Sequence, residues 1–186
     1  KGCEEGIIIG IYKLDTVGKG KLKVKLLGSG TILVKVREAA ALLAEKFGVE
    51  SEVYSVPSFN ELGRDGLSVE RHNMLHPTDK PQKAYITEVL EAGNTGPTIA
   101  ATDYMKAYAD QVRAYVPGAY RVLGTDGFGR SDSRQNLRRH FEVDAEFIAV
   151  AALYELVKAG DYKAQDLAAA IAELGIDADK INPLYA

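Results

Sequence analysis

Apolar residues recur along the chain with two different periods, and these periods predict a strand, a helix and a second strand near its start. Residues 21–27 alternate leucine or valine with lysine, which is the period-2 pattern of a strand. Residues 32–47 place apolar side chains at the 3.6-residue period of a helix, with Thr31 as a candidate N-cap and Gly48 positioned to end it. Residues 53–56 are the next strand candidate. A β-α-β unit of this kind has parallel strands.

The remainder of the chain continues the alternation of helices and strands. Asp132 with Gln135 three residues later forms a capping-box signal, and Asp144 begins the longest apolar helix. The pattern predicts an α/β fold with an open, mainly parallel sheet covered on both faces. The expected helices span 58–66, 69–76, 83–91, 102–115, 132–140, 144–159 and a last amphipathic segment around 167–174, and the further strands span 98–101 and 120–124.

Residues 1–20 do not fit this alternation. The apolar run at residues 6–12 has no preceding element to pack on, and residues 15–20 have the composition of a turn. We expect residues 1–20 to be a linker from a preceding domain of a longer polypeptide, and residues 21–186 to form the α/β domain.

Composition and charge limit the classes of function. The 186 residues are 46% hydrophobic and 26% charged, which is typical of a soluble globular protein, and no apolar run is long enough to span a membrane. The net charge of −3 is spread along the chain and predicts no nucleic-acid partner. A basic cluster, Arg134 with Arg138 and Arg139, is more typical of a solvated helix face than of a phosphate-backbone site. The single cysteine, Cys3, allows no internal disulfide and favours a reducing, cytoplasmic location.

The turn Gly28-Ser29-Gly30-Thr31 lies between a strand and a helix, where phosphate-binding loops occur. A dinucleotide fingerprint would need a third glycine at position 33, which is Leu33, and an acid near the end of the second strand. A plain strand-to-helix turn is therefore favoured. Because the positive end of a helix attracts anions, Gly28, Ser29, Gly30 and Thr31 remain a candidate weak anion-binding turn.

The histidines offer a weaker signal. His72 and His76 have the spacing of two metal ligands on one helical face, but a zinc-protease motif would need glutamate where this chain has Asn73. A structural or surface pair is favoured. With no serine-nucleophile motif and only an isolated cysteine, we assign no catalytic residue, no cofactor-binding residue and no metal ligand from the residues alone.

The glycine-rich stretch 123–132 follows a strand, at the end where α/β domains place binding groups. Phe128 and Arg130 are residue types that anchor interfaces, and three glycines allow a close approach of the backbone to another surface. A tight turn followed by a helix cap explains the stretch equally well. We take Asp126, Phe128, Arg130 and Asp132 as candidate interface residues.

Residues 129–134, together with 136–138 and 140–144, resemble the homodimeric bacterial pyruvate dehydrogenase E1 components. The resemblance extends from about Gly2 to the end of the chain, with one departure at His72, where the family has tryptophan. Further matching runs are 4–8, 10–14, 26–30, 36–40, 73–77, 102–106, 176–180 and 182–183. The resemblance implies the transketolase-like C-terminal domain of such an enzyme, with a Rossmann-like three-layer fold and a mostly parallel sheet of about five strands.

The resemblance also implies what the whole enzyme does. It would decarboxylate pyruvate on thiamine diphosphate with Mg²⁺ and reductively acetylate the lipoyl group of the E2 acyltransferase. The cofactor would lie between the N-terminal and middle domains, so this chain would bind none and would serve assembly with those domains and with a second E1 subunit. Two alternatives are a regulatory anion site at the carboxyl edge of the sheet, near Ser29 and Asp126, and an E2-binding module.

Overall fold

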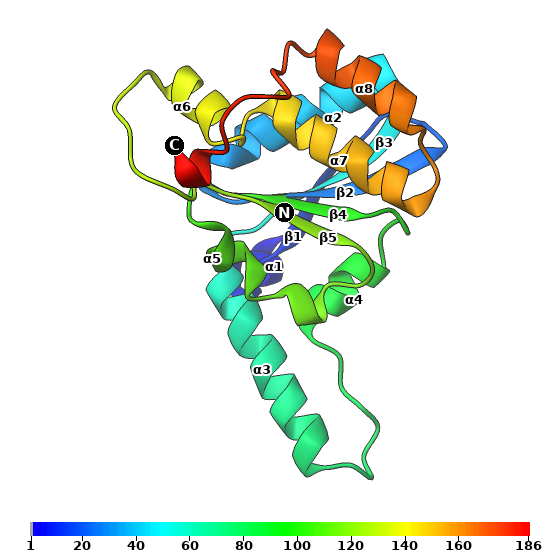
Figure 1. Cartoon of the computed structure of the whole chain (residues 1–186). Helices are drawn as coiled ribbons and strands as arrows, with labels where there is room; N and C mark the ends of the chain where they lie inside the picture. Colours follow the sequence, from blue (N-terminus) through cyan, green and yellow to red (C-terminus); the bar gives the residue numbers. More distant parts are fainter. Residues whose placement is uncertain (1) are drawn as a thin grey trace.

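The computed structural model describes residues 2–186, in which a five-stranded sheet lies between two layers of helices (Figure 1). The strand order is β1-β3-β2-β4-β5. Strands β2, β3, β4 and β5 are parallel, and β1 is antiparallel to β3 at one edge. The predicted α/β class with a mostly parallel, five-stranded sheet is therefore confirmed. The strands are β1 (Tyr12–Val17), β2 (Leu22–Gly28), β3 (Val49–Ser55), β4 (Thr98–Ala101) and β5 (Tyr120–Leu123).

The helices form one layer on each face of the sheet. Helices α2, α7 and α8 pack on one face and α1, α3, α4 and α5 on the other, while α6 lies beside α2 (Figure 1). No helix within residues 2–186 is long and apolar enough to cross a membrane. The bounds are α1 (Glu4–Ile9), α2 (Leu33–Phe47), α3 (Phe59–Leu75), α4 (Tyr85–Glu91), α5 (Lys106–Asp110), α6 (Arg134–His140), α7 (Ala145–Ala159) and α8 (Ala164–Glu173), with 3₁₀ turns η1 (Gly30–Ile32), η2 (Arg113–Tyr115) and η3 (Pro183–Tyr185).

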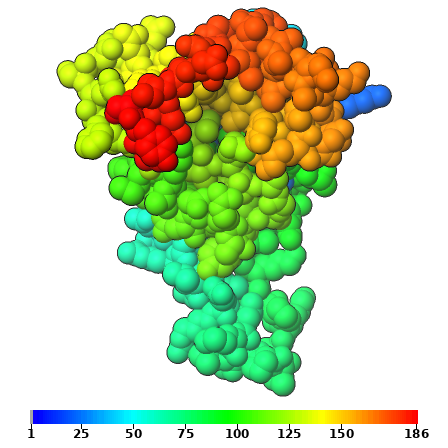
Figure 2. All heavy atoms as spheres, in the orientation of Figure 1, coloured from blue at the N-terminus to red at the C-terminus, as the bar shows by residue number. Residues whose placement is uncertain are grey.

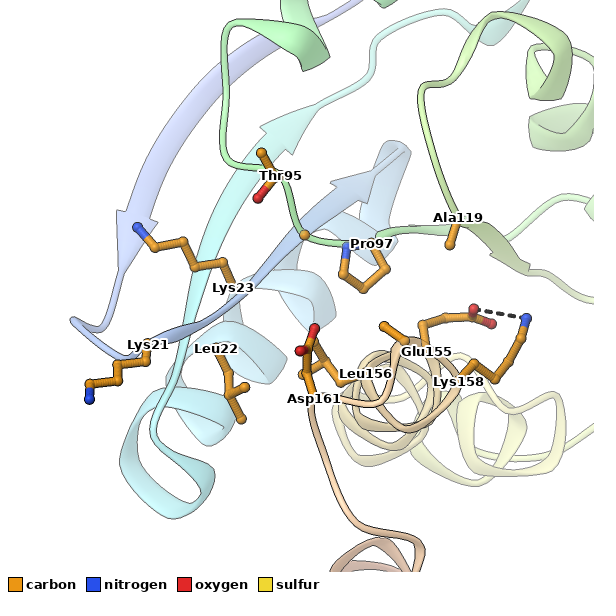
Figure 3. A pocket seen from close by; sticks show the side chains of 12 residues that line it. Lys21, Leu22, Lys23, Thr95, Pro97, Ala119, Glu155, Leu156, Lys158 and Asp161 are labelled. Atoms are coloured by element: carbon orange, nitrogen blue, oxygen red, sulfur yellow. Dashed lines mark hydrogen bonds and ion pairs between the residues drawn. The ribbon is translucent and has the colours of Figure 1, made fainter.

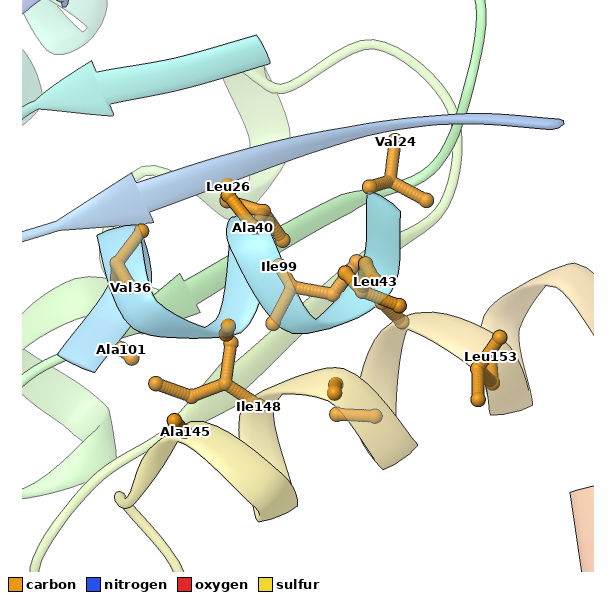
Figure 4. Packing of buried hydrophobic residues seen from close by; sticks show 14 of the residues in the cluster. Val24, Leu26, Val36, Ala40, Leu43, Ile99, Ala101, Ala145, Ile148 and Leu153 are labelled. Carbon is orange, nitrogen blue, oxygen red and sulfur yellow. The ribbon is translucent and has the colours of Figure 1, made fainter. Parts of the chain in front are cut away.

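Strand β2 contributes to the core on both faces. Leu26 packs with Leu43 of α2 and Ile148 of α7 in the larger apolar cluster (Figure 4). On the opposite face Leu27 joins Phe59 in the second cluster. Two layers of helices leave the central strands without a solvated face, as expected of a parallel sheet.

Lys25 also lies on β2 and is only 3% exposed. Its Nζ donates to the carbonyl oxygen of Asn94 at 2.7 Å, and burial is the main cause of the lowered pKa of its ammonium group. Glu52 on the neighbouring strand accepts from the Asn94 amide at 2.9 Å and from Lys13 at 2.6 Å. Burial opposes the ionisation of Glu52, but its hydrogen bonds outweigh burial and lower its pKa. These bonds tie the loop before β4 to the middle of the sheet.

Several predicted element bounds were wrong. The helices expected at 58–66 and 69–76 are one helix, α3, because Gly66 and Leu67 continue it without a break. Strand β3 begins four residues before the predicted start. Thr31 does not cap α2, since it lies inside the turn η1.

The loop regions before α5 and α6 also differ from the sequence prediction. Helix α5 begins at Lys106, not at Thr102 or Asp103. The cap of α6 is Ser133, whose hydroxyl accepts from the Asn136 amide, so the capping box expected at Asp132 is wrong. The predicted caps at Gly48 and Asp144 are confirmed, and Gly160 ends α7.

Residues 2–20, predicted as most of a linker, contain α1 and β1. The short apolar run ends at Ile11, which is fully buried against the second core cluster. The chain therefore contacts the sheet well before residue 21. A connection of this segment to a preceding domain stays a prediction, and Lys1 lies outside the described residues.

The outer half of α3 and the loop that follows project from the body of the molecule (Figures 1 and 2). The last buried residue of α3 is Gly66, against which the ring of Tyr115 packs. Beyond it, Asn73 holds the returning loop by two hydrogen bonds to the backbone of Gln82, at 2.8 and 2.9 Å. We call residues 67–83 the arm.

Val36 and Val34 of α2 provide a test of the core. Val36 is fully buried and Val34 is 57% exposed. We expect Val36→Ala to lower the free energy of unfolding by about 2 kcal/mol, because it removes two buried methyl groups and leaves a cavity. The matched change Val34→Ala should alter it by less than about 0.5 kcal/mol. Urea denaturation measures both, and equal losses would contradict the packing described here.

Candidate functional site

The loops that follow β2, β4 and β5 meet at the carboxyl edge of the sheet, because parallel strands all end on the same side. Three of the hydrogen bonds that join these loops are made by side-chain hydroxyl groups. The hydroxyl groups of Ser29 and Thr102 are 3.3 Å apart, Thr31 Oγ1 donates to Asp103 Oδ2 at 3.2 Å, and Thr125 Oγ1 donates to the carbonyl oxygen of Asp103 at 2.7 Å. Ligands of open α/β sheets bind at this edge.

The candidate anion-binding turn lies at this edge, and a carboxylate of the protein itself is already beside it. Ser29 is buried, while Gly30 has a left-handed backbone with φ of 55°. The Asp103 carboxylate bonds to Thr31 and lies next to Gly30, at 3.4 Å from the position that a Cβ atom would occupy there. Anion binding by Gly28, Ser29, Gly30 and Thr31 stays a prediction.

The four candidate interface residues belong to the loop between β5 and α6, but they have different surroundings. Asp126 is half-buried and accepts from the Lys106 amide at 3.2 Å, which fixes the start of α5. Asp132 accepts from Asn136 Nδ2 at 2.8 Å and from the Ser133 amide at 2.6 Å, and these bonds lower its pKa. Phe128 is 79% exposed and Arg130 is exposed.

The C-terminal segment packs on the glycine-rich turn (Figure 2). Gly127 has φ of 113°, and a Cβ atom at this position would lie 2.1 Å from the carbonyl oxygen of Pro183. Only glycine allows this backbone conformation and this approach together. The contact places Leu184 next to the glycine-rich turn.

Large apolar side chains are exposed around this turn. They come from the loop after β4, from the glycine-rich turn and from the C-terminal segment, and the backbone contacts of Gly124 with Tyr104 and of Gly127 with Pro183 join the three segments. Clustered exposed apolar residues mark protein interaction surfaces. We call this set the apolar edge surface: Tyr104, Met105, Phe128, Leu184 and Tyr185.

A cleft of about 380 Å³ lies beside the turn. Arg130, Arg134 and Arg138 line it, together with Asp103 and Thr31. We call it the arginine cleft. The basic cluster predicted as a solvated face is thus divided, since Arg134 and Arg138 line the cleft while Arg139 forms an ion pair with Asp144 at 3.2 Å.

Asp144 stabilises the start of α7 next to the cleft residue Val143. Its carboxylate accepts from the Phe147 amide at 2.9 Å. Burial is the largest influence and outweighs this bond and the Arg139 ion pair, so that it raises the pKa of Asp144 to about 6. Nearby, burial and then Arg130 and Lys180 lower the pKa of His140.

The histidine pair lies on the arm, away from this edge. The rings of His72 and His76 pack in a tilted arrangement with centroids 4.5 Å apart. Within residues 2–186 no group of three or more histidine, cysteine, aspartate or glutamate side chains is placed to hold a metal ion.

The sequence did not lead us to predict that Thr102 and Asp103 contact the turn Gly28–Thr31. It also did not predict that the C-terminal segment packs on the glycine-rich turn. The signal for Thr102 and Asp103 was available, because they directly follow a predicted strand that is parallel to β2. No local pattern connects Pro183 with Gly127, since the contact joins residues 56 positions apart in sequence.

Comparison with protein families gives one match over most of the chain. A family described as the transketolase-like TK C-terminal domain matches residues 10–144. A similar fold occurs in a transketolase from Leishmania mexicana, with a TM-score of 0.53 and 19% identity over 83% of this chain and 19% of that one. A transketolase variant from Pichia stipitis has a TM-score of 0.57 and 20% identity over 85% of this chain and 19% of that one. At these identities the solved structures support the fold alone.

Curated relatives are more similar in sequence. The pyruvate dehydrogenase E1 component of Escherichia coli K12 is 60% identical over 187 residues, which cover 100% of this chain and 21% of that protein. The proteins of the same name from Haemophilus influenzae and Pseudomonas aeruginosa are each 57% identical and are likewise covered over 21% of their length. The chain thus spans about a fifth of the length of these relatives.

Gly127 and Gly129 give a matched test of the packing of the C-terminal segment. Gly127→Ala introduces a clash with Pro183 and a strained backbone, so amide hydrogen exchange at Leu184 and Tyr185 should become about tenfold faster. Gly129→Ala meets no atom within 4 Å and should leave the exchange unchanged. Equal exchange in both variants would contradict the contact.

Asp144 predicts a pH dependence of stability. Its pKa of about 6 lies above the ordinary value of about 4 that applies in the unfolded chain, so between these values the folded state holds more protons. The contribution of Asp144 to stability therefore falls as the pH rises from about 4 to about 6 and is constant above this range.

Asp144→Asn removes the titration and keeps an N-cap side chain. Urea denaturation measures the free energy of unfolding of both chains. As the pH rises from about 4 to about 6, this free energy should fall more for the original chain than for the Asp144→Asn variant. A difference that stays constant from pH 4 to 7 would refute the assignment.

Proposed function

The chain belongs to the family of transketolase-like C-terminal domains, and on this basis we propose that it is the C-terminal domain of a pyruvate dehydrogenase E1 component. The observation that carries the proposal is the 60% identity to the Escherichia coli protein over the whole of this chain. A shared fold alone would not identify the enzyme, because folds host many functions. Identity at this level extends through the loops, where functional differences concentrate.

The enzyme proposed here decarboxylates pyruvate and reductively acetylates the lipoyl group of an E2 acyltransferase in the cytoplasm, with thiamine diphosphate and Mg²⁺ as cofactors. The carbanion chemistry is supplied by the thiamine group when it is bound. The residues that line the arginine cleft do not fit the Mg²⁺ ion of that cofactor pair. Mg²⁺ needs several oxygen ligands, whereas Asp103 is the one carboxylate lining the arginine cleft and already accepts from Thr31.

We therefore assign no chemical step to this chain and propose a role in assembly. The apolar edge surface supports this role, because side chains such as Phe128 and Tyr185, exposed by 79% and 77%, are stabilised by burial against a partner. The proposed partners are the other domains of the E1 polypeptide and a second E1 subunit. Arg130 adjoins this surface and is a residue type that anchors interfaces.

Replacing Phe128 and Arg130 tests this role in the full-length enzyme. Phe128→Ala with Arg130→Ala should raise the dimer dissociation constant by roughly 10-fold or more, since two interface anchors are lost. Analytical ultracentrifugation measures the constant. Val34→Ala with Arg37→Ala, an apolar and a basic residue on the exposed face of α2, is the matched control and should leave it unchanged.

An unchanged dimer in both double variants would overturn the assembly role of this surface. The membership of the E1 family does not depend on that result, because it rests on sequence. Enzymatic turnover by the full-length protein with pyruvate and a lipoyl acceptor tests the proposed activity separately.

A further inference from the structure

The arginine cleft carries an excess of positive charge. Among residues 2–186, no carboxylate lies within ion-pairing distance of the guanidinium groups of Arg130, Arg134 and Arg138. The single carboxylate that lines the cleft, Asp103, is bonded to Thr31. Three cations therefore share one cleft with one anion that already has a hydrogen-bond donor.

This arrangement costs the isolated chain some stability. Arg134 and Arg138 are four residues apart on α6, so their side chains lie on the same helical face. Like charges at this spacing destabilise a helix. An anion between them would reverse the sign of that effect, and guanidinium groups match the planar geometry of carboxylates and phosphates.

The cleft is apolar where it is not basic. Leu137 and Phe141 line it from α6 and the residue after it, and Ile32 and Val143 line it from the core side. A volume of about 380 Å³ is within the usual range for small-molecule sites, which combine an apolar lining with a few polar groups. An inorganic ion would contact only the arginines, whereas an organic anion would contact both parts.

A second cavity, of about 740 Å³, shows the contrast (Figure 3). It lies at the opposite edge of the sheet, where β2 begins, and it is also lined by basic residues. There, however, Lys158 bonds to Glu155 at 3.0 Å and Lys23 bonds to Glu50 at 2.9 Å. Two of the three lysines that line this cavity thus have carboxylate partners, whereas the three arginines of the first cleft have none within residues 2–186.

We propose that the arginine cleft binds a small organic anion, with its phosphate or carboxylate head on Arg130, Arg134 and Arg138 and its apolar part against Leu137 and Phe141. The proposal rests on the cleft and its charges and does not depend on the assignment of the chain to an E1 enzyme. The cleft overlaps the candidate turn Gly28–Thr31 only at Thr31, and its arginines come from the loop after β5 and from α6.

The test is a titration of the ¹⁵N-labelled chain, followed by NMR, with phenyl phosphate, benzoate and phenol as probes. Phenyl phosphate or benzoate should shift the amide signals of Thr125, Gly127 and Gly129 in a saturable manner, and phenol should not. Tighter binding of phenyl phosphate indicates a phosphate ligand, and tighter binding of benzoate indicates a carboxylate ligand. Failure of both anions to saturate these signals overturns the proposal.

A charge-matched pair of variants separates the site from general electrostatics. Arg134→Gln with Arg138→Gln should weaken binding of the preferred anion by roughly tenfold, because two charge-assisted contacts are lost. Arg71→Gln with Lys80→Gln removes two exposed cations from the arm and should change the affinity less than twofold. Equal weakening in both pairs overturns the proposal. If the Arg134→Gln, Arg138→Gln variant does not fold, Arg134→Gln alone replaces it, because Arg134 is exposed. We expect this single variant to bind the anion roughly threefold more weakly.

Discussion

Strand β2 lies at the centre of the sheet with helices against both of its faces, so from Val24 onward its side chains must all find partners inside the protein. Apolar residues do this by packing on α2 and α7. Lys25 does it by donating to the carbonyl oxygen of Asn94 in the loop before β4, because a buried ammonium group without acceptors would be costly. That loop in turn leads into the strand that supplies Thr102 and Asp103.

The same central strand explains where the binding features lie. Because β2, β4 and β5 run in one direction, their following loops meet at one edge, and side chains there have a rigid base. The apolar edge surface and the arginine cleft share this edge but differ in chemistry. One exposes aromatic and aliphatic groups, and the other gathers cations around an apolar lining.

Sequence periodicity predicted the parallel strands and the helices α2 and α7 well, because their apolar residues repeat with the period of the element. It failed where tertiary contacts decide the outcome. The alternation of lysine with leucine in β2 suggested a polar side, yet Lys25 is buried under a loop that no local pattern identifies. Gly66 suggested a helix end, but there it admits the ring of Tyr115 within a continuous α3. The arginines of α6 and the neighbouring Leu137 and Phe141 were visible in the sequence, whereas Ile32, which completes the apolar lining of the cleft, comes from a distant segment.

The arm has few of the contacts that hold the rest of the protein together. Beyond Gly66 its residues are exposed or partly exposed. Its returning loop is held mainly by the hydrogen bonds between Asn73 and Gln82. Local unfolding free energies follow such differences in burial. Local opening of the outer turns of α3 should therefore require less free energy than unfolding of the sheet. A partner that binds the helical form of the arm would stabilise that form against local unfolding. Its binding would slow hydrogen exchange of the arm amides and leave that of the sheet unchanged.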